Sequence, residues 1–347
     1  VWIANQQLDA TNPYYHNGTN GAPGTVNNNS TGANAAFDST SGTLTLSNLD
    51  VTTEGKGIKW EYSSDGAHDL IITLDEGTDN KVVSTADGAI GSYRGDNTTG
   101  FGPSLTIQGR GILEATGANT ASGIWAWKNI TIKEGVTVYA AGGINGIANN
   151  STIGMITIQD NAKVIASGGE YGIGYSYSNV NTPEIQGGAL VVSGGTAAMM
   201  KAPVIAKSFD NIRAGANQDG TGAAKIAAGD ITNASIGTYK YLKIVKGHTH
   251  CICGETHQAA GDHKRIELVE FQPHNDGTAL PATKGNYYLG SNVSIAETWV
   301  PQNESILCLN GKTISADASS ESGSSASNSA ISISNASNKF TLTDCTG

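Results

Sequence analysis

The feature of this sequence that most limits its fold is an internal repeat. Similar short apolar segments end in isoleucine at spacings of 25, 26 and 27 residues: Ile107, Ile132, Ile158 and Ile185. A period of this length with short β-branched runs is typical of a solenoid, because one such unit cannot bury a core alone. The chain is therefore expected to consist of stacked, similar rungs.

Each repeat carries two further apolar segments in the same order. The second segments contain Leu113, Val138, Val164 and Leu190, and the third are Gly123-Ile124, Gly146-Ile147, Gly172-Ile173 and, degenerate, Ala198-Met199. Two looser copies precede them, at residues 44–58 and 71–90. A β-sandwich repeats strands but not a three-part unit of constant length. The pattern therefore predicts an all-β fold, a right-handed parallel β-helix with rungs about 4.8 Å apart.

The composition agrees with a turn-rich β protein and limits its partners. Of the 347 residues 45 are glycine, and only 14% are charged. The net charge of −10 argues against nucleic acid or anionic lipid, because both require a basic surface. No apolar run reaches the roughly 20 residues of a membrane span, so no membrane insertion is expected in this chain.

Composition also divides the chain into regions. We expect residues 1–35 to form an irregular cap over the exposed end of the solenoid. Residues 36–246 hold the repeats. Residues 247–284 form a small Cys/His-rich linker, and residues 285–347 contain short strands that we interpret as the start of a second β-helical segment. Because the chain opens directly on Val1 and stops just after Cys345, we expect a monomeric part of a longer polypeptide.

Two stretches resemble parts of bacterial surface proteins. The pattern Ile72-Thr73-Leu74-Asp75-Glu76-Gly77, Gly88-Ala89-Ile90 and Leu105-Thr106-Ile107-Gln108-Gly109 resembles carbohydrate-binding right-handed β-helices that are related in fold to pectate lyases. The stretch from His248-Thr249-His250-Cys251-Ile252-Cys253-Gly254 to Leu342-Thr343-Asp344-Cys345 resembles a linker and module of large surface proteins of gut Firmicutes. The resemblance implies an extracellular, wall-associated protein that binds polysaccharide, with calcium in some relatives, and it supplies no catalytic residues.

Aromatic residues recur just after the third segment of several repeats: Trp60, Tyr93, Trp125, Trp127, Tyr175 and Tyr177. On an outward face, such rings would form a column of flat platforms for sugar rings. The alternative is that they cover a loop or fill a corner of the solenoid. Replacing Trp125 and Trp127 by Ala tests the sugar-binding interpretation through retention on a polysaccharide.

Two other clusters suggest metals. Asp75, Glu76 and Asp79 offer the oxygen ligands that calcium prefers, although a solvated acidic face is the favoured interpretation. His250, Cys251, Cys253 and His263, in a segment that also holds His248 and His257, could bind a structural zinc ion. The Cys-x-Cys spacing is tighter than usual for zinc. The alternatives are a disulfide between the two cysteines, which this spacing disfavours, and a solvated His-rich linker. Cys308 and Cys345 could form a disulfide or stack as buried thiols.

Three classes of function remain after these observations. The first is a non-catalytic polysaccharide-binding or adhesin module of a larger cell-surface or cell-wall protein. The second is a stalk or spacer without a specific ligand. The third is a polysaccharide lyase or glycosidase, which requires paired carboxylates. The acidic residues of the repeats form no column at matched positions, so catalysis is the least favoured of the three.

Overall fold

The computed structural model describes residues 1–18, 24–61, 69–93, 102–150, 154–175, 181–256, 264–316, 330–333 and 338–344. These residues form two compact units, Val1–Lys246 and Gly247–Gly347. Nearly all of the regular structure is β-strand. Within the described residues, no helix is long and apolar enough to cross a membrane.

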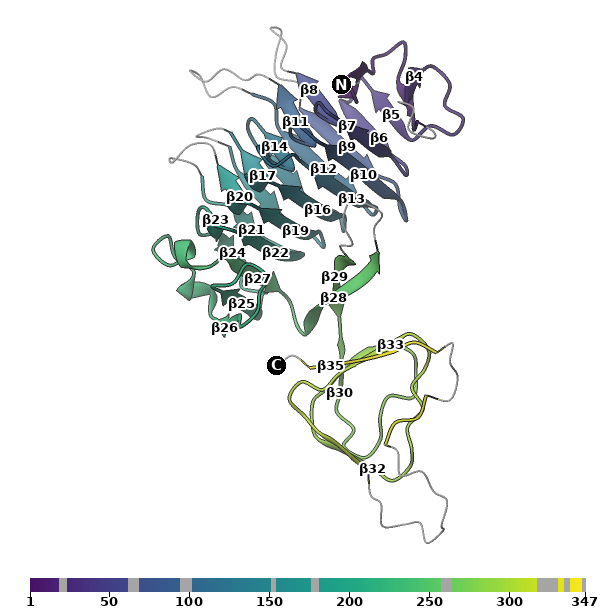
Figure 1. The fold of residues 1–347 in the computed structure, drawn as a ribbon, viewed down its shortest axis with the longest axis vertical. Helices are drawn as coiled ribbons and strands as arrows, with labels where there is room; N and C mark the ends of the chain where they lie inside the picture. The colour runs from purple at the N-terminus through teal and green to yellow at the C-terminus, as the bar shows by residue number, and fades with distance from the viewer. Residues whose placement is uncertain are drawn as a thin grey trace. The chain divides into compact units, whose positions relative to one another are not determined.

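The first unit is built on three large sheets, which we call A, B and C (Figure 1). Sheet A has the order β2 (Gln6–Gln7), β1 (Trp2–Ile3), β8 (Ile58–Glu61), β11 (Ile90–Tyr93), β14 (Ile124–Ala126), β17 (Asn145–Asn149), β20 (Tyr171–Tyr175) and β23 (Ala197–Met199). Sheet B has the order β24 (Val204–Ile205), β21 (Glu184–Ile185), β18 (Ile156–Ile158), β15 (Ile130–Ile132), β12 (Leu105–Gly109), β9 (Leu70–Leu74), β6 (Thr43–Leu46), β5 (Ala35–Asp38), β3 (Tyr14–His16) and β4 (Thr25–Asn27). Sheet C has the order β26 (Ala224–Ile226), β25 (Asn211–Gly215), β27 (Tyr241–Val245), β22 (Ala189–Gly194), β19 (Lys163–Gly168), β16 (Thr137–Gly142), β13 (Ile112–Thr116), β10 (Asp79–Ser84) and β7 (Asp50–Thr53).

From β6 to β24 the chain visits sheets B, C and A in turn, and from β9 onward each strand pairs in parallel with the strand three places earlier. The register reproduces the sequence repeat. In sheet B, Ile107 pairs with Ile132, Ile132 with Ile158 and Ile158 with Ile185. The sequence repeat therefore corresponds to one strand in each sheet, and the repetitive, largely parallel β architecture is confirmed.

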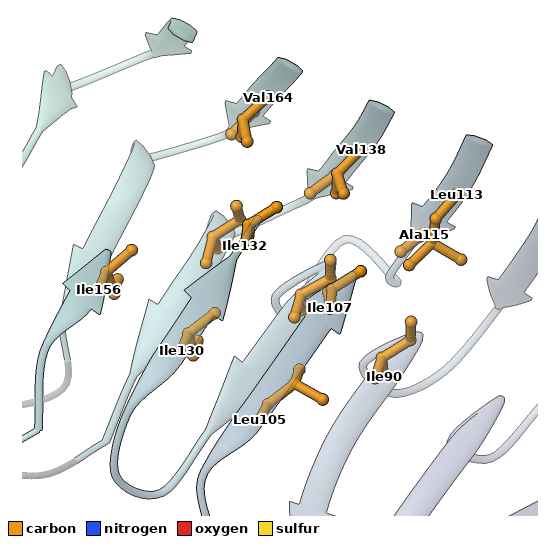
Figure 2. Close-up of a cluster of buried hydrophobic side chains, with 14 of the residues drawn as sticks. Ile90, Leu105, Ile107, Leu113, Ala115, Ile130, Ile132, Val138, Ile156 and Val164 are labelled. Atoms are coloured by element: carbon orange, nitrogen blue, oxygen red, sulfur yellow. The ribbon is translucent and has the colours of Figure 1, made fainter. Parts of the chain in front are cut away.

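The core lies between the sheets, because alternate residues of each strand point inward. Figure 2 shows Ile107 and Ile132 of sheet B pointing toward Leu113 and Val138 of sheet C. All four side chains are fully buried. Neighbouring rungs place similar aliphatic side chains at equivalent positions, so each rung completes the core of the next one.

The ends of this unit differ from its middle, because antiparallel strands cover them. At the N-terminal end β5 pairs antiparallel with β6, and β1 pairs antiparallel with β8. At the other end β27 pairs antiparallel with both β22 and β25, next to two short 3-10 helices, η1 (Ala228–Asp230) and η2 (Ile236–Thr238). The parallel arrangement expected across residues 36–246 thus holds from β6 to β24. An uncovered sheet edge would expose unpaired backbone groups. The antiparallel strands cover the N-terminal ends of sheets A and B and the other end of sheet C.

The second unit also contains parallel strands. β28 (Thr249–Thr256) and β29 (Lys264–Glu270) form an antiparallel pair. A parallel sheet follows, with the order β30 (Gln272–His274), β31 (Asn286–Leu289), β33 (Ser305–Cys308) and β35 (Phe340–Thr343), and β32 (Val293–Ile295) pairs in parallel with β34 (Ile314–Ala316). A small core of Leu280, Leu289, Val293, Ile295 and Leu307 lies within this unit. In the described part of the region expected to be a linker, residues 247–256 and 264–284, most residues lie in paired strands.

Candidate functional site

The outward face of sheet A carries a row of aromatic and charged side chains. Along β8, Ile58 and Trp60 are buried whereas Lys59 is only partly buried, so Lys59 points away from the core. The register pairs Lys59 with Trp2 and with Gly91, and Gly91 with Trp125. Directly paired residues share one face of a sheet. We call Trp2, Lys59, Gly91 and Trp125 the sheet A row.

Trp125 is the half-buried aromatic residue at one end of this row. A Cβ atom at Gly91 would lie 2.2 Å from its Nε1, and one at Gly88 would lie 3.1 Å from its Cδ1. The indole therefore lies across a strip of backbone that has no side chains. Lys56 Nζ is 5.5 Å from the ring centroid and 2.6 Å from Asp87 Oδ2. A flat ring, an ammonium group and a carboxylate thus lie close together.

At the other end of the row, an indole ring, an ammonium group and a carboxylate again lie close together. Lys59 Nζ lies 4.5 Å from the ring centroid of Trp2 and 2.8 Å from Glu61 Oε1. Two strand spacings, about 10 Å, separate Lys59 from Trp125 along the row. The sequence repeat did not indicate Trp2, because Trp2 joins the row through the antiparallel pairing of β1, which lies outside the repeat.

Trp127 supports Trp125 and is itself largely covered. The two rings meet edge to face, with centroids 6.3 Å apart and planes at 63°. Trp127 is 9% exposed, its backbone N–H donates to Ser92 Oγ at 3.0 Å, and Gly102 packs directly against its ring. Trp127 therefore holds Trp125 in place, and of these two rings Trp125 is the one that faces solvent.

Two members of the predicted outward column of aromatic residues point inward instead. Trp60 is 2% exposed and Tyr175 is 6% exposed. Each follows an inward isoleucine by two positions, Ile58 and Ile173, and residues two apart share a face. Trp125 follows Ile124 by one position and so faces outward. Trp60 and Tyr175 belong to the core, and burial raises the pKa of Tyr175 well above its ordinary value.

The structure does not describe the side chains of the two remaining aromatic candidates, Tyr93 and Tyr177. The backbone of Tyr93 ends β11, but its side chain is not described. Tyr177 lies outside the described residues. The sugar-binding hypothesis therefore depends on Trp125 among the residues selected from the sequence.

The acidic residues selected for calcium lie on the surface without converging. Asp75, Glu76 and Asp79 are exposed, and Glu76 Oε1 lies 3.8 Å from Arg110 Nη1. In the described part of the chain, they do not gather into a group of three or more potential ligands. The arrangement corresponds to a solvated acidic face.

Two histidines and one cysteine of the second unit do converge. The Nε2 atoms of His248 and His250 are 2.8 Å apart, and His248 Nε2 lies 3.3 Å from Cys308 Sγ. All three ligand atoms lie within 4.8 Å of one another. Of the ligands selected from the sequence, this group contains His250, together with His248 of the same segment and the distant Cys308.

The other predicted zinc ligands are placed less completely. Cys251 and Cys253 lie in β28, where they pair with Leu268 and Ile266, but their side chains are not described. His263 lies outside the described residues. Cys345, the predicted partner of Cys308 in a disulfide or a pair of stacked thiols, also lies outside them. Among the side chains that the structure describes, the group of potential metal ligands consists of His248, His250 and Cys308.

A second open surface lies near the N-terminus, on the outer side of sheet B. This N-terminal groove has a volume of about 440 Å³, and it is lined by Tyr14, Phe37, Asp38 and the hydroxyls of Ser39, Thr40, Thr43 and Thr45, among others. The pKa of Asp38 is lowered by hydrogen bonds from the Ser41 hydroxyl and the Thr40 backbone N–H. Sequence reasoning missed this groove, because antiparallel strands outside the repeat build it.

The chain has no match among the proteins with which it was compared. No protein-family model, no curated protein and no solved structure is similar enough to match it. Its function is inferred from its own side chains and their arrangement.

Proposed function

We propose that this chain is an extracellular, non-catalytic polysaccharide-binding module of a bacterial cell-surface or cell-wall protein. In this proposal sheets A, B and C are the walls of a right-handed parallel β-helix. The cyclic visiting order of β6 to β24 and the parallel register support that interpretation. A long, rigid stack of rungs suits a binding module, because its faces hold side chains at regular spacings.

The observation that carries the proposal is the sheet A row. An indole ring such as that of Trp125 binds the apolar C–H face of a sugar. The sugar hydroxyls then need charged or polar partners beside the ring. Lys56 and Asp87 lie next to Trp125, and Lys59 and Glu61 lie farther along the same face. The row is long enough to contact more than one sugar ring of a chain.

The carboxylates of this face favour binding over hydrolysis. Asp87 Oδ2 lies 2.6 Å from Lys56 Nζ, and Glu61 Oε1 lies 2.8 Å from Lys59 Nζ. Ion-paired carboxylates accept hydrogen bonds from hydroxyl groups. Glycoside hydrolysis requires in addition a carboxylic acid that donates a proton to the leaving group. The paired charges therefore support recognition of a neutral, hydroxyl-rich ligand.

The test is retention of the whole chain in gels that contain plant or host polysaccharides, with the variants Trp125→Ala and Tyr14→Ala. We expect at least one polysaccharide to retard the wild type, and Trp125→Ala to bind that polysaccharide with an affinity lower by about tenfold or more. A lost stacking contact contributes about 0.5 to 1.5 kcal/mol beyond the buried area, and 1.4 kcal/mol is a factor of ten. Tyr14→Ala, a change in the N-terminal groove, should be retarded like the wild type.

Other outcomes separate the alternatives. Loss of retention in Tyr14→Ala with full retention in Trp125→Ala would move the site to the N-terminal groove and contradict the proposal. A chain that no polysaccharide retards would be a spacer. Release of unsaturated or reducing sugars would establish a lyase or a hydrolase. Thermal unfolding of both variants shows whether a lost interaction reflects the binding face alone.

A further inference from the structure

The second unit contains a compact group of nitrogen and sulfur ligands that the proposed glycan-binding face does not involve. It consists of His248, His250 and Cys308. The thiol of Cys308 is fully buried, and both histidines are partly buried. His248 and Cys308 are 60 residues apart in the chain, yet His248 Nε2 and Cys308 Sγ lie 3.3 Å apart.

Strand pairing brings the three residues together. His250 lies at the start of β28 and His248 just before it, two positions apart, which places both on one side of an extended chain. Cys308 ends β33, where it pairs directly with Tyr288 of β31. The ring of Tyr288 stacks on that of His248, with centroids 4.2 Å apart and planes at 14°. The partner strand of the cysteine thus orients one of the histidines.

Apolar contacts surround the group and hold the second ring. The ring centroid of Phe271 lies 4.4 Å from that of His250 and 5.8 Å from that of His248. The Phe271 backbone N–H also donates to the His248 carbonyl at 2.9 Å. Both imidazoles are therefore positioned by packing before any ligand binds, which is the arrangement expected of a structural metal site.

We propose that His248, His250 and Cys308 bind one zinc ion, which joins the β28 end of the hairpin to β33. Zinc takes imidazole nitrogen at about 2.0 to 2.1 Å and thiolate sulfur at about 2.3 Å in a tetrahedron. That geometry separates two nitrogens by about 3.3 Å and a nitrogen from a sulfur by about 3.6 Å. The two pairs that include His248, at 2.8 and 3.3 Å, require shifts of about 0.3 to 0.5 Å. The third pair, His250 and Cys308, lies within 4.8 Å and must draw together on binding.

The chemistry of the donors selects the metal. Calcium and magnesium prefer oxygen ligands, whereas zinc accepts imidazole and thiolate together. Metal binding would release the thiol proton of Cys308, because thiolate is the ligating form. A fourth ligand would complete the tetrahedron.

The experiment uses the full chain, purified without added chelator and then equilibrated with zinc. Elemental analysis should find one zinc per chain, and the zinc content should fall at least severalfold in Cys308→Ser and in His250→Asn. His274→Asn is the matched control, because His274 lies in the same unit and binds the Ala279 carbonyl through Nε2 instead. Circular dichroism of each variant shows whether it has folded.

X-ray absorption at the zinc edge of the wild-type chain makes the result independent of variant folding. The proposal predicts a shell with at least one sulfur and two imidazole nitrogens. A chain without stoichiometric zinc, or a shell without sulfur, would overturn it, and the three residues would then be a hydrogen-bonded cluster. Retention of zinc in Cys308→Ser together with its loss in Cys251→Ser would overturn the assignment of Cys308.

Discussion

Replacing Ile132 by Ala tests how the stacked rungs stabilise one another. Ile132 lies in β15 and pairs with Ile107 on one side and Ile158 on the other. All three side chains are 0% exposed, and Figure 2 shows Ile107 and Ile132 side by side in the core. Thr131, its neighbour in the same strand, points to the opposite face and is partly exposed. Thr131→Ala is therefore the matched control.

The expected magnitude follows from this environment. Ile132→Ala removes three carbon atoms from a site without solvent, and each buried carbon contributes about 0.8 kcal/mol, or about 2.4 kcal/mol in total. The flanking isoleucines are held by their own strands and cannot fill the space, so a cavity term raises the loss to about 4 kcal/mol. Thr131→Ala should change the free energy of unfolding by less than about 0.5 kcal/mol.

Urea unfolding followed by circular dichroism measures both variants. Hydrogen exchange of the amides in β12, β15 and β18 locates the effect, because each rung contacts only its neighbours. Exchange should accelerate in these three strands more than in β6 or β24. Equal losses for the two variants, or a loss below about 1 kcal/mol for Ile132→Ala, would refute the packing argument.

Other changes test particular contacts. Asn80→Leu should lower the free energy of unfolding by about 2 to 4 kcal/mol, because the buried side-chain amide of Asn80 forms hydrogen bonds with two backbone groups and one hydroxyl. A decrease of less than about 1 kcal/mol in urea unfolding would contradict this. Gly102→Ala places a Cβ 1.6 Å from Trp127 Cδ1, so the melting temperature should fall and the tryptophan emission should shift. An unchanged melting temperature and emission spectrum would refute the contact. The hydrogen bond from the Ser41 hydroxyl lowers the pKa of Asp38 below its ordinary 3.8. Its stabilising contribution is present above that value and is lost as the pH falls through the folded pKa. Between pH 7 and strongly acidic pH, the wild type should therefore lose more stability than Asp38→Asn, and parallel melting curves would contradict the assignment.

The repeat could be predicted from the sequence because its signal is local and recurs. Ile107, Ile132 and Ile158 occupy equivalent places in successive segments, and stacking equivalent side chains is the simplest way to bury all of them. The same reasoning could not predict the ends of the unit. There β1 and β27 pair antiparallel, and no repeated pattern specifies their partners.

Two members of the predicted aromatic column, Trp60 and Tyr175, point inward for a reason that the sequence already contained. Trp60 lies two positions after Ile58, and Tyr175 two positions after Ile173, so strand alternation directs both rings into the core. Trp125 lies one position after Ile124. Aligning the aromatic residues by repeat alone ignored this difference of one residue, which reverses the face of a strand.

The cysteine and histidine group shows a different limit. A cluster such as Cys251 and Cys253 is conspicuous because its members are neighbours in sequence. Cys308 is 58 residues beyond His250, and only the pairing of β31 with β33 brings it close. Non-local pairing of this kind depends on the complete fold of the unit.

The most direct test of glycan recognition is retention of the intact chain on a panel of immobilised plant and host polysaccharides, measured for the wild type and for Trp125→Ala. The account predicts that at least one polysaccharide retains the wild type, and that the same polysaccharide releases Trp125→Ala about tenfold more readily. Passage of the wild type through every column, or equal retention of the two proteins, would contradict it.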